Sequence, residues 1–211
     1  MELQDMRTAV LYRAGMDPLD GMVPSAVLNS FINGAIRQVT IMQDWDWNWS
    51  SETITSVVDQ DAYDRAADAR KTDMVHDIVD GGLLEQINPR MAHRYNPTQV
   101  YSGRTSIARF WYVQNGKLYL VPTPQSIRTY NHVYVSTETI LVNDTDEPGI
   151  PDYAIDIVLV KAAMMVTART DNTSQHRLLA DEERDLLDSL DDEARRSRGS
   201  SIIRSRRDWR I

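Results

Sequence analysis

The chain has 211 residues, of which 42% are hydrophobic and 26% are charged, a composition typical of a folded protein with a substantial core. It contains no cysteine, which excludes disulfides, thiolate metal sites and cysteine nucleophiles. Its first residues do not form a signal-peptide pattern, and no apolar run is long enough to span a membrane. We therefore expect an intracellular origin and no membrane partner.

Charge is distributed unevenly along the chain. The net charge is −8, yet residues 195–211 contain seven arginines and a single acid, Asp208. This segment carries +6 and the preceding residues carry −14. An acidic body with a basic end indicates that the two parts have different roles.

Two helices are predicted in the first part of the chain. Residues 2–14 have apolar side chains at helical spacing, and Gly15 follows where a C-cap belongs. A second helix is predicted from Pro24 or Ser25 to about Asp44, because its apolar residues recur in steps of three and four. These residues are Val27, Leu28, Phe31, Ile32, Ala35, Ile36, Val39 and Met42.

A β-rich region is predicted next, beginning at Trp45, where the periodicity changes to two. Asn115-Gly116 between two apolar runs indicates a type I′ hairpin turn. Asp80-Gly81-Gly82 suggests a second hairpin. The expected strands are 52–58, 74–79, 83–87, 107–113, 117–121 and 129–136, with a short helix at 89–95, an ambiguous segment at 64–72 and a loop at 137–149.

Helices are predicted again after Pro151, which suits a first helical turn. Residues 152–168 are apolar on nearly all sides, which indicates the centre of a bundle or an interface. A last amphipathic helix is expected at 174–196. The predicted fold class is α+β: a bundle of about four helices with a β-rich insertion. The predicted parts are 1–47 and 150–198 for the bundle, 48–149 for the insertion and 199–211 for an extended basic arm.

No arrangement of residues indicates catalysis. The four histidines lack ligand spacing, Gly81-Gly82 is not followed by the Lys-Ser/Thr of a phosphate loop, and no serine lies in a G-x-S-x-G turn. The acids at 181–183 and 191–193 are most simply a solvated helix face. We expect no enzymatic activity, no cofactor and no metal.

Trp45, Trp47 and Trp49 have two interpretations. Alternate residues of a strand share a face, so the three indoles could stack on a sugar. This would suit a carbohydrate-binding or hydrolytic protein. The alternative is that the large aromatic side chains anchor the sheet to the helices, which we favour.

The basic arm has three interpretations: phosphate binding, a solvated tail, or docking on another protein. Docking explains why aliphatic and aromatic residues alternate with arginines, since Trp and Arg dominate protein–protein hot spots. The candidate docking residues are Ile202, Ile203, Arg204, Arg206, Arg207, Trp209, Arg210 and Ile211.

A succession of motifs carries a family resemblance. After the Trp-rich end of the second helix come T-I-T-S-V-V, D-Q-D-A-Y, N-G-K-L-Y-L-V-P-T-P, D-E-P-G-I-P-D-Y, an Ala-rich helix and an acidic amphipathic helix. In this order they resemble the head-to-tail adaptor (connector) proteins of tailed bacteriophages over about residues 24–195. Two departures are Asp59, where the family turn has glycine, and residues 66–72, which lack the usual L-P.

The resemblance implies a structural protein of the virion, made in the bacterial cytoplasm and located at the head–tail junction. Such adaptors form a ring, typically of twelve copies, between the portal protein and a downstream tail or nozzle protein. Double-stranded DNA passes through without sequence-specific binding, and the C-terminal segment, here Ser200–Ile211, reaches the portal. An acidic body would leave DNA free to slide, and the apolar helix at 155–166 would be covered by neighbouring copies. The alternative is a nucleic-acid-binding protein that acts through its Arg-rich tail.

Overall fold

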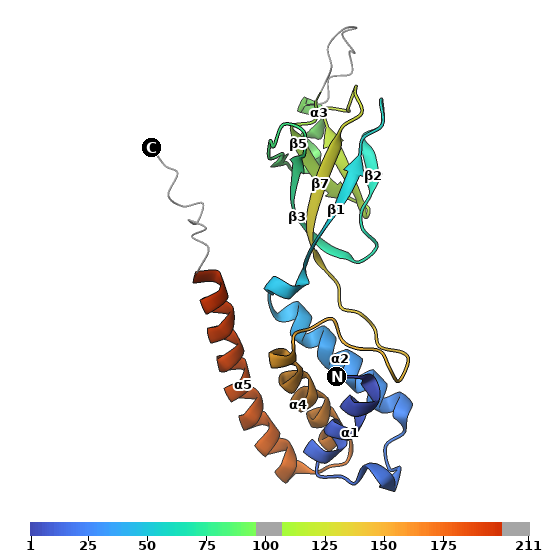
Figure 1. The fold of residues 1–211 in the computed structure, drawn as a ribbon, viewed down its shortest axis with the longest axis vertical. Coiled ribbons are helices and arrows are strands. Elements are labelled where there is room, and N and C mark those ends of the chain that lie inside the picture. Colours follow the sequence, from blue (N-terminus) through green and yellow to red (C-terminus); the bar gives the residue numbers. More distant parts are fainter. Residues whose placement is uncertain (96–106, 200–211) are drawn as a thin grey trace. The chain divides into compact units, whose positions relative to one another are not determined.

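The computed structural model describes residues 1–95 and 107–199, which divide into two compact units (Figure 1). A helical unit comprises Met1–Trp47 and Glu138–Ile211, and a β unit comprises Asn48–Thr137. The described residues thus form a mixed α+β fold with helices and two sheets.

The helical unit is built on long helices whose bounds follow the predicted periodicity. They are α1 (Leu3–Arg13), α2 (Ser25–Met42), α4 (Asp152–Arg169) and α5 (Thr173–Gly199), with the 3₁₀ turn η1 at Pro18–Asp20. Helix α4 packs against each of α1, α2 and α5. Its position explains why its sequence is apolar on nearly all sides.

Local sequence signals set the helix ends. Gly15 has a φ of 72°, and the amides of Gly15 and Met16 donate to the carbonyls of Tyr12 and Leu11. This is the Schellman arrangement, in which a residue without a Cβ takes the left-handed conformation. At the other end of the unit, Pro151 is the N-cap of α4.

The β unit contains two sheets. One has the order β1-β7-β3 and the other the order β2-β6-β5-β4. The 3₁₀ turn η2 (Asp46–Asn48) spans the boundary between the units along the chain. The elements of the β unit are β1 (Trp49–Thr55), β2 (Ala62–Asp64), β3 (Ala69–Asp77), β4 (Glu85–Gln86), η3 (Pro89–Met91), α3 (Ala92–Tyr95), β5 (Phe110–Gln114), β6 (Lys117–Val121) and β7 (Thr129–Ser136). A separate core fills this unit around Trp111, Leu118, Leu120 and Tyr130, all of which are buried.

The Asn115-Gly116 turn forms as predicted. Both residues have positive φ, 50° and 76°, which is the requirement of a type I′ turn. The turn sets the register between β5 and β6, where Gln114 pairs with Lys117. Strands β6 and β7 have the predicted bounds.

Two strand predictions were wrong in detail, and one segment that the sequence left ambiguous is resolved. Residues 46–48 form the 3₁₀ turn η2, so the β region begins at Trp49 instead of Trp45. The ambiguous segment 64–72 contains β2's last residue and the start of β3. The expected hairpin between 74–79 and 83–87 is reduced to one bridge, His76 to Leu83.

The segment after that bridge joins the other sheet. Glu85 and Gln86 pair in parallel with Phe110 and Trp111 of β5. The buried indole of Trp111 donates to the carbonyl of Leu84 at 3.2 Å. Burial of this aromatic side chain therefore outweighs the local hairpin signal.

The insertion is shorter than the predicted 48–149, because residues 138–149 belong to the helical unit. Leu141 is buried in the helical core. The side chain of Asn33 on α2 both donates to the Leu141 carbonyl and accepts from its amide, each at 2.9 Å. Residues 138–149, which the sequence assigned to the β-rich insertion, are therefore bound to helix α2.

Candidate interaction surfaces

The predicted docking arm lies outside the described residues. Ile202, Ile203, Arg204, Arg206, Arg207, Trp209, Arg210 and Ile211 all follow Gly199. Their role therefore stays a prediction.

Helix α4 does not offer the apolar outer face that the sequence suggested. Its buried residues are Ala154, Ile155, Ile157, Val158, Leu159, Val160, Ala162, Ala163, Val166 and Thr167. They are covered by α1, α2 and α5 of the same chain. The expectation that neighbouring copies cover the apolar residues of this helix was wrong for these ten residues, since packing within the chain already buries them.

Ion pairs connect the long helices at the charged positions of α4. Arg13 of α1 pairs with Asp156 of α4 at 2.5 Å and with Glu182 of α5. Lys161 of α4 pairs with Glu183 of α5. These interactions account for both charges that interrupt the apolar sequence of α4 and for two of the acids of α5.

The acids at 144–147 are also engaged within the helical unit. Asp144 pairs with Arg7, and Glu147 pairs with the N-terminal amine at 3.5 Å. The carboxylate of Asp146 accepts from the amides of Val142 and Asn143, each at 2.8 Å. These hydrogen bonds favour the ionised form and lower the pKa of Asp146. Asp144 and Glu147 therefore attach this loop to α1 and the N-terminus, and Asp146 fixes the backbone of the loop itself.

Helix α5 carries a second group of acids, whose surroundings differ from those of the acids at 144–147. Asp181, Asp185, Asp188 and Asp192 are exposed, and their spacing of four, three and four places them along one helix face. Within the described part of the chain these four carboxylates have no ion-pair partner. We call this set the acidic stripe of α5; Glu182 and Glu183, which face Arg13 and Lys161, are not part of it.

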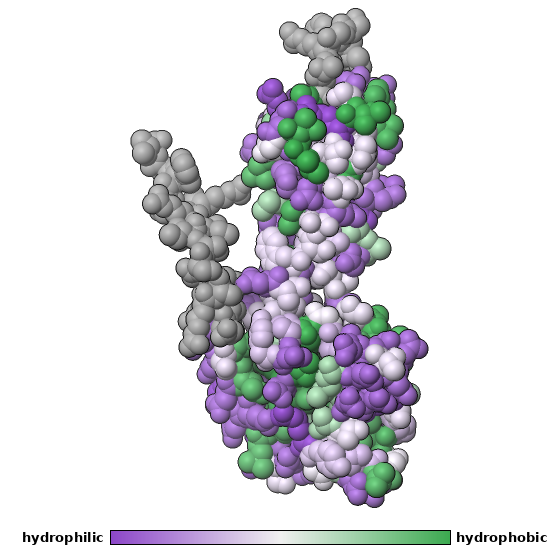
Figure 2. All heavy atoms as spheres, in the orientation of Figure 1, coloured by the Kyte–Doolittle hydropathy of each residue, from purple (hydrophilic) through white to green (hydrophobic). Residues whose placement is uncertain are grey.

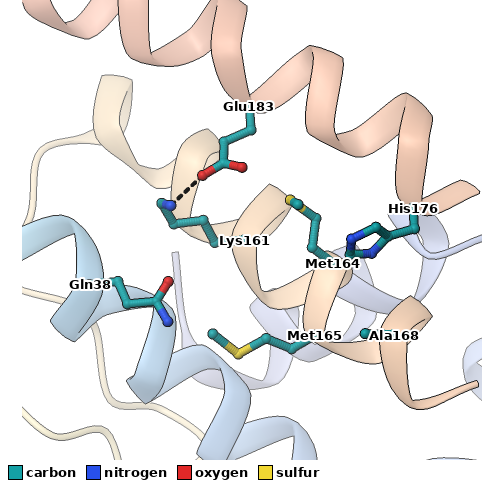
Figure 3. A pocket seen from close by; sticks show the side chains of 7 residues that line it. All are labelled: Gln38, Lys161, Met164, Met165, Ala168, His176 and Glu183. Carbon is teal, nitrogen blue, oxygen red and sulfur yellow. Dashed lines mark hydrogen bonds and ion pairs between the residues drawn. The ribbon is translucent and has the colours of Figure 1, made fainter.

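A hollow of about 280 Å³ lies between α2, α4 and α5 (Figure 3). It is lined by Gln38, Lys161, Met164, Met165, Ala168, His176 and Glu183. Figure 3 shows the Lys161–Glu183 ion pair on one side, Met164 beside His176, and Met165 between Gln38 and Ala168. His176 Nδ1 is 3.0 Å from Thr167 Oγ1. Flexible methionines on a concave surface suit an apolar side chain of another protein.

The tryptophans form no sugar-binding row. Trp45 is buried in the helical core and stacks on Trp47 with ring centroids 4.6 Å apart. The rings of Trp47 and Tyr153 of α4 are nearly perpendicular, with centroids 5.8 Å apart. Trp49 begins β1 in the other unit. The 3₁₀ turn η2 breaks the alternation that would have placed the three indoles on one strand face.

The histidines and acids do not assemble a metal site: among the residues that the structure describes, no three His, Asp or Glu side chains are grouped to hold an ion. His132 is fully buried, with Nε2 2.9 Å from Thr72 Oγ1 and Nδ1 3.2 Å from Glu52 Oε1. Burial lowers the pKa of His132, although Glu52 opposes the shift. No described helix is long and apolar enough to cross a membrane.

The candidate functional features of the described residues are therefore the methionine-lined hollow and the acidic stripe of α5. Residues 1–206 match the family model described as SU10 adaptor protein. The chain therefore belongs to the SU10 adaptor family, a family of bacteriophage head–tail adaptors. The search of curated proteins returned no match.

Proposed function

We propose that the protein forms a ring between the portal and the tail of a bacteriophage and extends the DNA channel. The observation that carries the proposal is the match of the SU10 adaptor family over residues 1–206. In this proposal the four long helices act as a bundle organised about α4, and the protein has no catalytic role.

The acidic stripe of α5 supports the channel. A duplex moving through a ring must be guided without being held, and unpaired carboxylates repel phosphates. Asp181, Asp185, Asp188 and Asp192 meet this requirement, whereas the acids at 144–147 are engaged in contacts of their own. We therefore assign the channel lining to α5, in a ring that we expect to contain twelve copies.

The methionine-lined hollow supports contact between neighbouring copies. Cyclic rings use heterologous contacts, in which one surface of a copy meets a different surface of the next. Replacing Met165 with Glu would place an unpaired charge in the hollow, which we expect to prevent ring assembly while the monomer stays folded. Replacing Ala168 with Glu is the matched control. Ala168 is exposed and lies at the edge of the same hollow, so we expect a smaller effect on ring assembly.

The arm Ser200–Ile211 is proposed to dock on the portal. Its twelve residues can extend over roughly 40 Å, and its alternation of arginines with Ile202, Ile203, Trp209 and Ile211 suits a protein surface. Deleting Ser200–Ile211 should leave a folded protein that no longer binds portal rings. Unchanged portal binding by the truncated protein would disprove this role.

Light scattering tests the proposal as a whole. When the protein is added to a purified portal ring, the mass of the complex should increase by a fixed multiple of the mass of one copy. This multiple gives the stoichiometry. The alternative, a nucleic-acid-binding protein that uses its Arg-rich tail, predicts no association with portal and duplex binding that weakens steeply with salt. The +6 charge of residues 195–211 is the observation that supports the alternative.

A further inference from the structure

The connection between α1 and α2 presents two apolar side chains to solvent. Leu19 is 91% exposed and Met22 is 71% exposed. Residues on either side of them are anchored, since Val23 is buried and Met16 packs against the helical core. We call Leu19 and Met22 the apolar knob. Figure 2 shows hydrophobic surface at the end of the helical unit where this connection runs.

Hydrogen bonds fix the backbone of the apolar knob. Leu19 lies in the 3₁₀ turn η1, and its amide donates to the carboxylate of Asp17 at 2.9 Å. The amide of Asp20 donates to the Asp17 carbonyl at 3.2 Å, and Gly21 ends the turn with a φ of 62°. A side chain presented on a fixed backbone loses little conformational entropy when it is bound.

The methionine-lined hollow has room for such a side chain. Its volume is about 280 Å³, and a cavity of about 150 Å³ already holds a benzene molecule. Met164 and Met165 of α4 line the hollow, and unbranched thioether side chains adapt to an inserted group. One helical unit therefore carries both a projecting apolar side chain and a surface that can receive it.

The knob and the hollow lie apart within one chain. About 20 Å of helix separates Ser25, where α2 begins after the knob, from Gln38, which lines the hollow. Figure 1 places the α1–α2 connection and α5 on opposite sides of the helical unit. The hollow available to the knob is therefore that of another copy. A contact between two different surfaces is heterologous, and its repetition by rotation closes a ring.

Two acids flank Leu19 at the knob. Asp17 and Asp20 are both exposed, and within the described part of the chain neither has an ion-pair partner. The knob thus has an apolar centre with negative charge beside it. This combination disfavours the phosphates of DNA and favours a surface that is apolar at its centre and basic at its edge.

The hollow has such an edge. Arg169 and Arg177 follow Ala168 and His176 of the lining, and both are exposed. Neither arginine has an ion-pair partner among the residues that the structure describes. They outnumber the one acid between them, Asp171, and the acidic stripe of α5 begins beyond Arg177. Opposite charges beside two apolar surfaces of the same chain select a neighbouring copy as the occupant.

We propose that Leu19 of one copy inserts into the methionine-lined hollow of the next copy, with Asp17 and Asp20 beside Arg169 and Arg177. The inference rests on the proposed ring and names the contact that closes it. Each copy then gives its knob to one neighbour and receives the knob of the other.

Introduced cysteines test this contact without background, because the chain contains none of its own. The double variant Leu19→Cys with Ala168→Cys is bound to purified portal rings, its mass increase is measured by light scattering, and it is oxidised with copper–phenanthroline. A disulfide forms only where two Cα atoms lie within about 7 Å. We expect a ladder of covalent adaptor multimers on non-reducing gels, and none from either single variant.

The other outcomes each overturn the proposal in a different way. A normal mass increase without a ladder would reject the knob contact and leave the ring intact. Dimers from Leu19→Cys alone would show a two-fold contact between knobs, and a covalent product with portal would show that the knob docks there. Absence of a mass increase would reject the ring, and this contact with it.

Assembly measurements provide the second test. Leu19→Ser, at a position too exposed to affect folding, should raise the concentration that saturates portal about tenfold. Val142→Ser, 69% exposed on a loop of the same unit, is the control and should leave it unchanged. Equal saturation by both variants would overturn the role of Leu19.

A charge exchange identifies the occupant. Asp20→Arg should weaken assembly, and Arg177→Asp added to the same chain should restore most of it, because opposite charges again lie beside the two surfaces. This recovery requires that both charges belong to the adaptor. Its absence would overturn the assignment of a neighbouring copy, whereas the mass increase of the parent protein on portal would still support the ring.

Discussion

Lys161 of α4 and Glu183 of α5 form an ion pair in which the side chains are only 10% and 21% exposed. It lies beside the methionine-lined hollow (Figure 3). Since removal of one partner leaves a poorly solvated charge, Lys161→Met should lower the free energy of unfolding of the helical unit by about 2–4 kcal/mol. Urea unfolding followed by far-ultraviolet circular dichroism measures this loss.

The double variant Lys161→Met with Glu183→Leu should recover most of that stability, because no isolated charge is left. A matched control is Arg37→Met, which removes the pair with Glu138 at 3.6 Å, where Arg37 is 71% exposed. We expect the control to cost less than about 0.5 kcal/mol. Equal losses for Lys161→Met and Arg37→Met would show that burial does not strengthen the α4–α5 pair.

The buried His132 should make the β unit sensitive to acid. Its pKa is lowered in the folded protein by burial, while the unfolded value is about 6.5. The unfolded chain therefore binds the proton more readily, so stability is complete above about pH 6.5 and is lost as pH falls through the folded pKa. The ring nitrogens contact Thr72 and Glu52, the ring stacks on Tyr134 with centroids 5.0 Å apart, and the charge of Arg65 also lowers the pKa of His132.

Melting temperatures measured between pH 8 and pH 5 check this expectation. His132→Gln should flatten the dependence in this range, although it should lower stability at every pH because the buried contacts change. His93→Gln, at an exposed position, should leave the dependence as in the parent protein. A slope that persists in His132→Gln would assign the acid sensitivity to another group.

The Asn115-Gly116 turn provides a test of backbone strain. A Cβ at Gly116 would meet no atom within 4 Å, but the φ of 76° is unfavourable for alanine. Gly116→Ala should therefore destabilise the β unit by about 1 kcal/mol. Gly82→Ala is the matched control, since a Cβ there also meets nothing and φ is not positive. Equal effects of the two substitutions would show that φ at Gly116 carries no cost.

The sequence was most informative where local chemistry determines the backbone. Asn115-Gly116 and Gly15 tolerate the left-handed conformation, and Pro151 has a restricted φ; the turn, the helix end and the helix start lie where these residues predict. The apolar periodicity of α2 and α4 likewise predicted their bounds within about two residues. Such signals depend only on residues close together in the sequence, so they can be recognised without knowledge of the tertiary structure.

Long-range packing could not be predicted in the same way. Nothing local to Glu85 and Gln86 indicates that they leave their hairpin to pair with β5, because the cause is the buried indole of Trp111. Leu141 is a second example, because it is buried in the helical core and hydrogen bonded to Asn33 of α2, which is distant in the sequence. The apolar sequence of α4 did not reveal whether its cover is internal or a neighbouring copy.

The acidic stripe gives the most direct test of the channel. Asp185→Lys with Asp188→Lys would turn part of a repelling surface into one that binds phosphates. Virions that carry this variant should release DNA more slowly, by about tenfold at low salt, and the delay should shrink as salt rises because condensed ions compete for the phosphates. The rate of DNA release after triggering, measured with an intercalating dye, is the readout.

Asp64→Lys on β2 is the control, because its side chain is 89% exposed and lies outside the helical unit. If both variants release DNA at the parent rate, the stripe of α5 does not face the duplex. If both slow release equally, any added positive charge has the effect and the assignment to α5 is lost. Only a delay confined to the α5 variant places Asp185 and Asp188 along the path of the DNA.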